Sequence, residues 1–165
     1  MYPTETVYGL GCLPRFPESI EQLLKIKQRP STKGLILVGS RRTHLEPFVA
    51  PLTESQWQKI ESPQPRATTW IVPASLSLSP LISGQHDTVA IRLSNHPVVT
   101  RLCLDCDSAL ISTSANISGQ ANVRTLSNLP SQITHQAALV LSGPCGPDQR
   151  PSQILDIDTG KVTRS

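Results

Sequence analysis

Basic and hydroxyl side chains recur in this 165-residue sequence at places where helices or strands are expected to end. Arginine forks match two oxygens of a phosphate or carboxylate, lysine adds a mobile positive charge, and hydroxyls and amides complete the orientation of an anion. Phosphoryl and nucleotidyl transfer need little more, because the protein mainly positions reactants and neutralises charge. The sequence therefore predicts an anion-binding site. Its candidate residues are Lys27, Arg29, Lys33, Arg92 and Arg164, with Thr4, Thr6, Thr88, Ser112, Ser114, Asn116 and Ser152.

Each of these signals, taken alone, has a plainer interpretation. The cations of 27–29 could simply complement the carboxyl end of a helix. The polar run 112–116 could be a turn that bonds its own backbone. Arg92 is more informative, because it stands in the apolar strand 89–93, where an unpaired guanidinium is costly. A bound anion or a buried partner is therefore expected beside Arg92.

Other catalytic motifs are absent from the sequence. It contains no GxxxxGK[ST] phosphate loop, no HExxH and no GxSxG. The four histidines have no ligand spacing, which favours surface or capping roles and disfavours a metal-centred hydrolase. Cys103 and Cys106 form a lone CxxC, a motif that is found in metal and redox sites. Because there is no second pair and no nearby histidine, the sequence instead predicts that they are two helix residues spaced i,i+3.

Helical and strand patterns alternate along the chain, which predicts one α/β domain with a twisted mixed sheet flanked by helices. A β-prone run over 2–10 is expected to end in a Gly-x-Gly turn, and capping boxes are expected at Thr43-x-x-Glu46 and Thr53-x-x-Gln56. The expected helices are 18–28, two short ones within 45–60, and 97–104. The expected strands are 35–38, 68–72, 88–93, 109–113, 138–141 and a terminal hairpin of 153–157 with 161–163.

Bulk properties narrow the class without choosing a function. With 38% hydrophobic and 16% charged residues, the length suits a single compact domain. A net charge of +3 is compatible with nucleotide or RNA partners. No apolar stretch approaches the ~20 residues that span a bilayer, so no membrane partner, a cytoplasmic location and reduced cysteines are expected.

Five segments, in this order, resemble the YrdC/TsaC family: YPTETVYGLGC, KQRPSTKGLILV, HDTVAIRLSNHPVV, STSANISGQ, and RPSQILDIDTG with a basic end VTRS. The resemblance runs through nearly the whole chain and implies a YrdC-like domain over 1–165. It also implies an L-threonylcarbamoyladenylate synthase, a nucleotidyltransferase that makes threonylcarbamoyl-AMP and pyrophosphate from L-threonine, bicarbonate or CO₂, and ATP with Mg²⁺. The product would serve tRNA threonylcarbamoyladenosine (t6A) modification, through a transferase complex and with tRNA as a candidate partner.

The resemblance also assigns roles to residues. Its KxR pair falls on Lys27 and Arg29, which are the expected catalytic residues, and no protein side chain is assigned to a metal. The residues implied to bind ATP are Lys27, Arg29, Lys33, Thr88, Ser114, Asn116 and Arg164. Those implied to hold threonine or its carbamate are Thr6, Arg92, Ser112 and Ser152.

The sequence departs from the family pattern at its start, since family members usually carry a helix and the beginning of a strand before PTET. An uncovered sheet edge and marginal stability are therefore expected.

Two alternatives to the synthase remain: a non-catalytic module of the same fold that binds structured RNA, and a carbamoyl-transfer domain like that of hydrogenase-maturation enzymes. Arg92 together with KxR and SxN favours the synthase over RNA binding, which needs spread cations more than a buried amino-acid pocket. The much longer hydrogenase-maturation proteins have acylphosphatase and zinc-binding parts that this sequence lacks.

Overall fold

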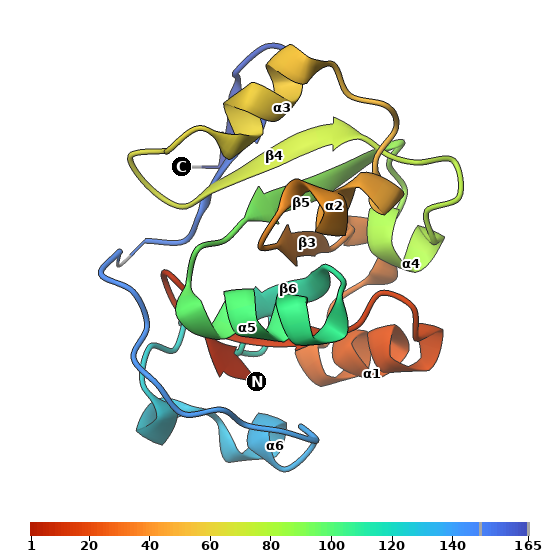
Figure 1. The fold of residues 1–165 in the computed structure, drawn as a ribbon. Coiled ribbons are helices and arrows are strands. Elements are labelled where there is room, and N and C mark those ends of the chain that lie inside the picture. Colours follow the sequence, from red (N-terminus) through yellow and green to blue (C-terminus); the bar gives the residue numbers. More distant parts are fainter. Residues whose placement is uncertain (149, 165) are drawn as a thin grey trace.

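The architecture is a mixed eight-stranded sheet with helices packed on it (Figure 1). The structure is a computed structural model that describes residues 1–148 and 150–164, with the backbone but not the side chain of Arg164. The strand order is β1-β2-β6-β3-β5-β4-β7-β8, in which β3 pairs parallel with β5 and β4 parallel with β7. The strands are β1 (Tyr2–Pro3), β2 (Tyr8–Cys12), β3 (Ile36–Gly39), β4 (Thr68–Pro73), β5 (Thr88–Leu93), β6 (Leu110–Ser114), β7 (Gln153–Asp156) and β8 (Val162–Arg164). The predicted α/β class and mixed sheet are confirmed.

The helices follow the predicted starts and stops closely where the capping chemistry is strong. Helix α1 (Pro17–Lys27) begins with proline at its first turn and ends at Gln28, whose left-handed φ of 49° turns the chain away. Helix α3 (Glu54–Glu61) carries the predicted Thr53 and Gln56 capping box. The remaining helices are α2 (Arg42–Leu45), α4 (Pro80–Ser83), α5 (Pro97–Cys106) and α6 (Ser131–Thr134), with 3₁₀ turns at Ser31–Lys33, Glu46–Phe48 and Leu126–Asn128.

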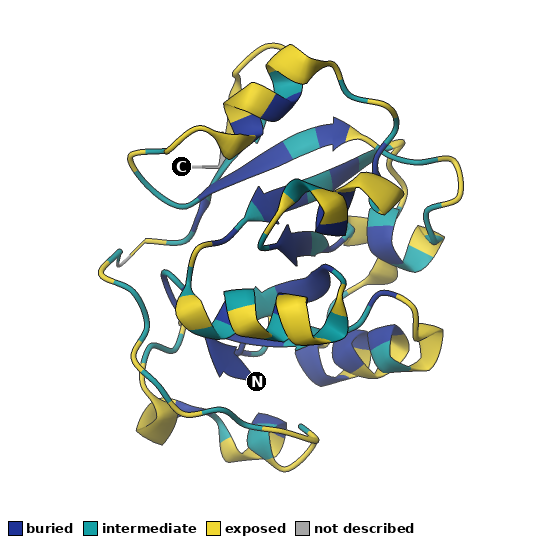
Figure 2. Cartoon of the chain, viewed as in Figure 1, coloured by how far each residue is buried: buried dark blue, intermediate teal, exposed yellow. Residues whose placement is uncertain are grey.

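The two faces of the sheet have different surroundings because successive side chains of a strand point to opposite sides. In β5, Val89 and Ile91 are buried in the main core, whereas Arg92 points to the other face. There, Val38 and Leu110 pack with Cys103 of α5 in a smaller core. Figure 2 shows the outer side of α5 exposed to solvent and the strands largely buried. Helix α5 covers only part of this face, which leaves room for a cavity beside it.

The expected Gly-x-Gly turn is wrong: both glycines lie inside β2, and the turn falls earlier, between β1 and β2. A Cβ on Gly11 would lie 2.3 Å from the Ile111 carbonyl oxygen and 2.5 Å from the Tyr2 hydroxyl. A Cβ on Gly9 would press on the Tyr2 ring, Thr4 and Ser112. These glycines therefore permit close packing within the strand and do not turn the chain.

Two other local expectations are also wrong. Thr43 lies inside α2 and does not cap it, because that helix begins after Arg41, which makes no side-chain cap bond. Residues 138–141 form no strand. They instead lie along the start of the chain, where the Met1 ammonium donates to the Leu139 carbonyl at 2.5 Å and the Leu141 amide donates to the Met1 carbonyl at 2.9 Å.

The first residues of the chain are well packed. Met1 and Tyr2 are 6% and 5% exposed. The expected marginal stability stays a prediction. No helix within 1–148 or 150–164 is long and apolar enough to cross a membrane.

Candidate active site

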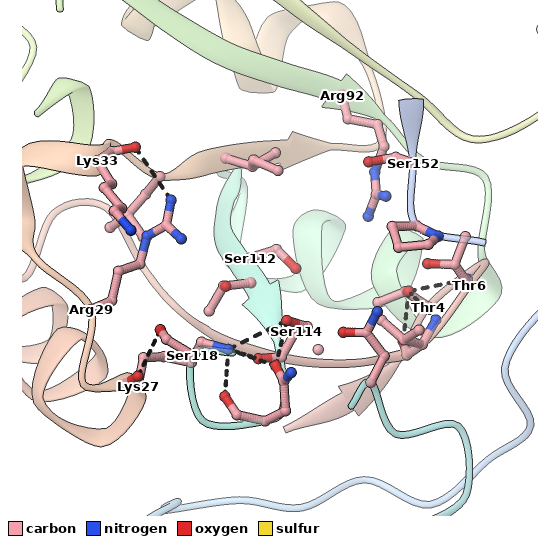
Figure 3. A pocket seen from close by; sticks show the side chains of 18 of the residues that line it. Thr4, Thr6, Lys27, Arg29, Lys33, Arg92, Ser112, Ser114, Ser118 and Ser152 are labelled. Carbon is pink, nitrogen blue, oxygen red and sulfur yellow. Dashed lines mark hydrogen bonds between the residues drawn. The ribbon is translucent and has the colours of Figure 1, made fainter. Parts of the chain in front are cut away.

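A cavity of about 320 Å³ opens on the sheet face beside α5, within the size range of small-molecule pockets. The segments that build it are the ends of β2, β5 and β6, the stretch from the end of α1 to β3, and the residues just before β7. Figure 3 shows Lys27, Arg29 and Lys33 at one end and Arg92, Ser152 and Thr6 at the other, with Ser112 and Ser114 between them. The sequence-predicted residues that line it are Thr4, Thr6, Lys27, Arg29, Lys33, Arg92, Ser112, Ser114, Asn116 and Ser152.

Lys27 is buried and surrounded by acceptors. Its Nζ lies 2.5 Å from the carbonyl oxygens of Ser114 and Asn116, 2.8 Å from Asn116 Oδ1 and 3.3 Å from Ser114 Oγ. Burial, with a smaller contribution from the charge of Arg29, lowers the pKa of Lys27 to about 8. The ammonium thus anchors the Ser114 to Asn116 turn and supplies positive charge at the floor of the cavity.

The turn after β6 bonds itself as well as Lys27. The Ser114 hydroxyl donates to Asn116 Oδ1 at 2.6 Å, and the Asn116 amide donates to the Gln120 carbonyl at 2.5 Å. The plainer interpretation of this segment as a self-bonded turn is therefore correct, and its residues line the cavity as well. Such bonding fixes the hydroxyl and amide before any ligand arrives.

Arg29 organises the loop that follows α1. Its Nε and Nη2 donate to the Gly34 carbonyl at 3.3 and 2.9 Å, and Nη2 also reaches the Lys33 carbonyl at 3.3 Å. Burial lowers the pKa of this guanidinium. The bonded loop holds Lys33 on the cavity wall next to Arg29, so two cations stand together at this end.

The other end of the cavity contains one buried cation among hydroxyls. Arg92 is 7% exposed, and its Nε has no hydrogen-bond partner within the described residues. Its Nη2 lies 3.6 Å from Glu5 Oε2. The Ser152 hydroxyl lies 3.0 Å from the Thr69 hydroxyl, which fixes its place beside Arg92. The buried partner expected for Arg92 is therefore present as Glu5, and anion binding by Arg92 stays a prediction.

Three chain segments meet behind this end of the cavity. Thr4 Oγ1 donates to the Val7 carbonyl at 2.7 Å and holds the turn between β1 and β2. The Arg124 guanidinium donates to the carbonyls of Thr6, Gly146 and Asp148. Arg124 thereby ties this turn to the segment that leads to Ser152.

The electrostatics of the cavity are one-sided. Within the described part of the chain, its lining contains four cations, at positions 27, 29, 33 and 92, and no carboxylate. Such a lining favours a ligand with several negative charges at one end and a further anionic group at the other. Fold and site together define an α/β domain with a cationic cavity whose lining suits anionic ligands.

Comparison with known proteins gives the family. The model of the Sua5/YciO/YrdC family, described as "Telomere recombination", matches residues 1–165, and the chain belongs to this family. Curated relatives named threonylcarbamoyl-AMP synthase include those of Vibrio vulnificus (strain YJ016), 43% identical, and Mannheimia succiniciproducens, 44% identical; each match covers 99% of this chain and 89% or 90% of the relative. The fold matches P. abyssi Sua5 complexed with L-threonine, with a TM-score of 0.86 and 25% identity over 94% of this chain and 46% of that one. The predicted family, fold class and enzyme class are confirmed.

Two of the predicted ATP-binding residues are not placed in the cavity. Thr88 begins β5, four residues before Arg92, and is not among the lining residues. Because a strand rises ~3.3 Å per residue, Thr88 lies on the order of 13 Å from Arg92 along β5. The side chain of Arg164 lies outside the described residues.

Cys103 and Cys106 do share α5, and the described residues contain no group of three or more His, Cys, Asp or Glu that could hold a metal.

Sequence reasoning missed some lining residues and the groups behind the wall. Ser118 donates its hydroxyl to the Lys27 carbonyl at 2.9 Å, and Asn122 lies further along the same loop. Neither stood out, because a polar residue in a loop is ordinary. Glu5 could have been noticed, because it is a carboxylate between Thr4 and Thr6, two candidate site residues that the structure shows to be buried. Its partner Arg92 is 87 positions away, so the sequence did not suggest the pair.

Proposed function

We propose that this chain is an L-threonylcarbamoyladenylate synthase. Threonine's amine would capture CO₂ derived from bicarbonate, and a carbamate oxygen would then attack the α-phosphorus of ATP. The bond from that phosphorus to the bridging oxygen would break, and pyrophosphate would leave with the electron pair. The product, threonylcarbamoyl-AMP, would pass to a transferase for t6A modification of tRNA.

The observation that carries the proposal is the division of the cations that line one cavity between its two ends. Lys27, Arg29 and Lys33 suit a triphosphate, whereas Arg92, set apart at the other end, suits a single carboxylate. The name shared by the curated relatives and the threonine bound to P. abyssi Sua5 support the same substrates. ATP at the first end and threonine at the second would bring carbamate and α-phosphate together near Ser112 and Ser114.

The donor set also bears on Mg²⁺. This ion prefers oxygen ligands, carboxylates above all, yet the described lining of the cavity has none. The oxygens of Ser114 and Asn116 are bonded to Lys27 and to each other. Mg²⁺ is therefore proposed to enter as MgATP, held by the phosphates as part of the substrate.

The protein's contribution would be positioning and charge neutralisation. Arg29 and Lys33 would bind the leaving pyrophosphate, and the Ser114 to Asn116 turn would orient the α-phosphate. The hydroxyls of Thr6, Ser112 and Ser152 would surround the amino acid and its carbamate. Holding the two reactants in one cavity replaces an encounter in water with a unimolecular step, and this can contribute ~7–11 kcal/mol.

The test is incubation with MgATP, bicarbonate and L-threonine, followed by measurement of pyrophosphate and of an adenylate by mass spectrometry. Pyrophosphate release should require both threonine and bicarbonate, since the attacking carbamate contains both. Equal release with either one omitted would contradict the proposal. A product adenylate without the threonylcarbamoyl mass would contradict the substrate assignment.

A further inference from the structure

The buried Arg92 is paired with a carboxylate that does not hydrogen bond to it. Glu5 Oε2 lies 3.6 Å from Arg92 Nη2, beyond hydrogen-bond range, and neither Glu5 Oε2 nor Arg92 Nε has another hydrogen-bond partner among the described residues. The two side chains are 19% and 9% exposed. The pair therefore supplies opposite charge without using the donors of the guanidinium.

Glu5 approaches Arg92 from outside the active-site cavity. Arg92 lines that cavity, whereas Glu5 lines a second cavity of about 670 Å³ bounded by the loop before β4, the end of β5 and residues 147, 148 and 150. The pair is thus part of the wall between the two cavities. A ligand carboxylate in the active site would meet the face of Arg92 that Glu5 does not occupy.

The position of Glu5 is fixed by its surroundings. The hydroxyl of Ser94, a buried residue just after β5, donates to Glu5 Oε1. The Gly146 amide bonds the Thr4 carbonyl at 2.9 Å, and a Cβ on Gly146 would lie 2.5 Å from the Glu5 carbonyl oxygen. The backbone of residue 5 is therefore packed tightly, and Oε1 is committed to Ser94. Only Oε2 remains to face Arg92.

From this geometry we propose that Glu5 is the internal counter-ion of Arg92, a positioning residue that keeps the guanidinium buried in the empty site and weakens its hold on carboxylate ligands. An uncompensated buried guanidinium is costly, and Glu5 offsets that cost when no ligand is present. The same negative charge repels an arriving carboxylate. Glu5 thereby limits the affinity for substrate and for product, both of which carry the amino-acid carboxylate. The inference rests on the proposed function in taking an amino acid as that ligand.

The first experiment is a double-mutant cycle on the ligand-free protein, which does not depend on the proposed function. Glu5→Gln keeps the shape and an acceptor for Ser94 but removes the charge. We expect it to lower stability toward urea more than Glu61→Gln does, a matched charge change in the same second cavity. Adding Arg92→Gln to Glu5→Gln should recover part of the loss, with a coupling of at least about fivefold in the unfolding equilibrium constant. Coupling below twofold overturns the proposal. If Glu5→Gln alone does not fold, the double variant Glu5→Gln with Arg92→Gln must fold, and its failure to fold also overturns the proposal.

The second experiment measures threonine binding by calorimetry without ATP. Glu5→Gln should tighten L-threonine binding by about tenfold, since one repulsive charge beside the carboxylate is gone. Glu61→Gln should leave it unchanged, and so should Glu5→Gln when the probe is L-threoninol, which has no carboxylate. Weaker or unchanged threonine binding in Glu5→Gln, or tighter L-threoninol binding, overturns the proposal. If wild type releases no threonine-dependent pyrophosphate while the cycle shows coupling, the proposed function fails and the Glu5 to Arg92 pair stands. If neither wild type nor Glu5→Gln binds threonine, Arg92 is no carboxylate receptor and the proposal fails.

Discussion

The two ends of the active-site cavity hold their cations in opposite ways. At the end proposed to bind the triphosphate of ATP (the triphosphate end), Lys27 and Arg29 are bonded to neutral backbone and side-chain oxygens, which fix their geometry but leave their charge uncancelled. At the end proposed to bind the amino acid (the amino-acid end), Arg92 has its charge offset by Glu5, and its Nε has no hydrogen-bond partner among the described residues. The first end thus keeps uncancelled positive charge, and at the second the charge of Arg92 is offset by a carboxylate. A polyanion suits the former, and a single planar carboxylate suits the latter.

The largest effect should come from removing the cation at the amino-acid end. Arg92→Gln should lower kcat/KM for threonine by on the order of 30-fold to several-thousand-fold, because losing one partner of a buried charge pair costs ~2–5 kcal/mol. Affinity for MgATP, measured by calorimetry without threonine, should stay within about twofold, a margin of ~0.4 kcal/mol. A parallel loss of ATP binding would show that the two ends are not separate.

At the triphosphate end, Arg29→Ala should lower turnover more than it lowers stability. Loss of a preorganised charge clamp in the transition state costs ~2.7–4 kcal/mol, or roughly 10²–10³ in kcat. The lost bonds to the Gly34 and Lys33 carbonyls should cost ~1–2 kcal/mol in unfolding free energy. The exposed Lys25, in the last turn of α1, provides the control. Lys25→Ala should change neither turnover nor the free energy of unfolding by much. Activity within about threefold of wild type, ~0.7 kcal/mol, would reduce Arg29 to a helix-end cation.

A smaller effect should appear in the pH dependence of ATP binding. The pKa of Lys27 in the free protein is lowered to about 8, so the ammonium is charged below that pH and neutral above it. Each deprotonation removes a positive charge from the cavity floor, and MgATP affinity should therefore be constant below about pH 8 and fall above it. Calorimetry on either side of this pKa, without threonine or bicarbonate, isolates the effect. Arg29→Gln removes a neighbouring charge that lowers the pKa of Lys27, so the fall in MgATP affinity should move to higher pH. If the fall stays at the same pH, a group other than Lys27 causes it.

The smallest effect is expected at Thr88. The family pattern assigns this residue to ATP, yet it lies at the opposite end of β5 from Arg92 and outside the lining of the cavity. Thr88→Ala should leave KM for ATP within about twofold, since a surface change away from the site is worth under ~0.5 kcal/mol. A tenfold rise in KM would restore the assignment and would mean that the nucleotide reaches far beyond the cavity described above.

Local chemistry explains why much of the fold could be predicted. Pro17 and Pro30 bracket a helix that ends at Lys27, and the strand predicted over 88–93 matches β5 from end to end. The Gly9 and Gly11 positions could not be predicted correctly, because their close neighbours Tyr2 and Ile111 become visible only when β1, β2 and β6 are paired. Propensity identified the run as β-prone, but tertiary packing decided where it turned.

The site could be predicted in its cations and not in its counter-charges. Lys27 and Arg29 stand out because they follow a helix, and Arg92 stands out because it interrupts an apolar strand. That Lys27 is committed to Ser114 and Asn116 depends on contacts 87 and 89 residues apart. The same holds for Glu5 and Arg92. Sequence shows which groups need partners, and only the fold shows which partners they find.

The long return of the chain from β6 to β7 has a consequence for synthesis. Residues 124 and 139–146 bond back to the first eight residues, through Arg124, through the Met1 contacts and through the Tyr8 hydroxyl, which donates to the Gly143 carbonyl at 2.9 Å. Figure 1 shows this stretch passing α6 and then running along the side of the molecule to β7. Because proteins are made from the amino terminus and distant contacts close last, the PTET turn must wait on the ribosome for residues made more than a hundred positions later. At the other end of the cavity, the bonds of Arg29 to the Lys33 and Gly34 carbonyls are local, whereas Lys27 needs Ser114 and Asn116. The amino-acid end is completed only after Ser152 has emerged.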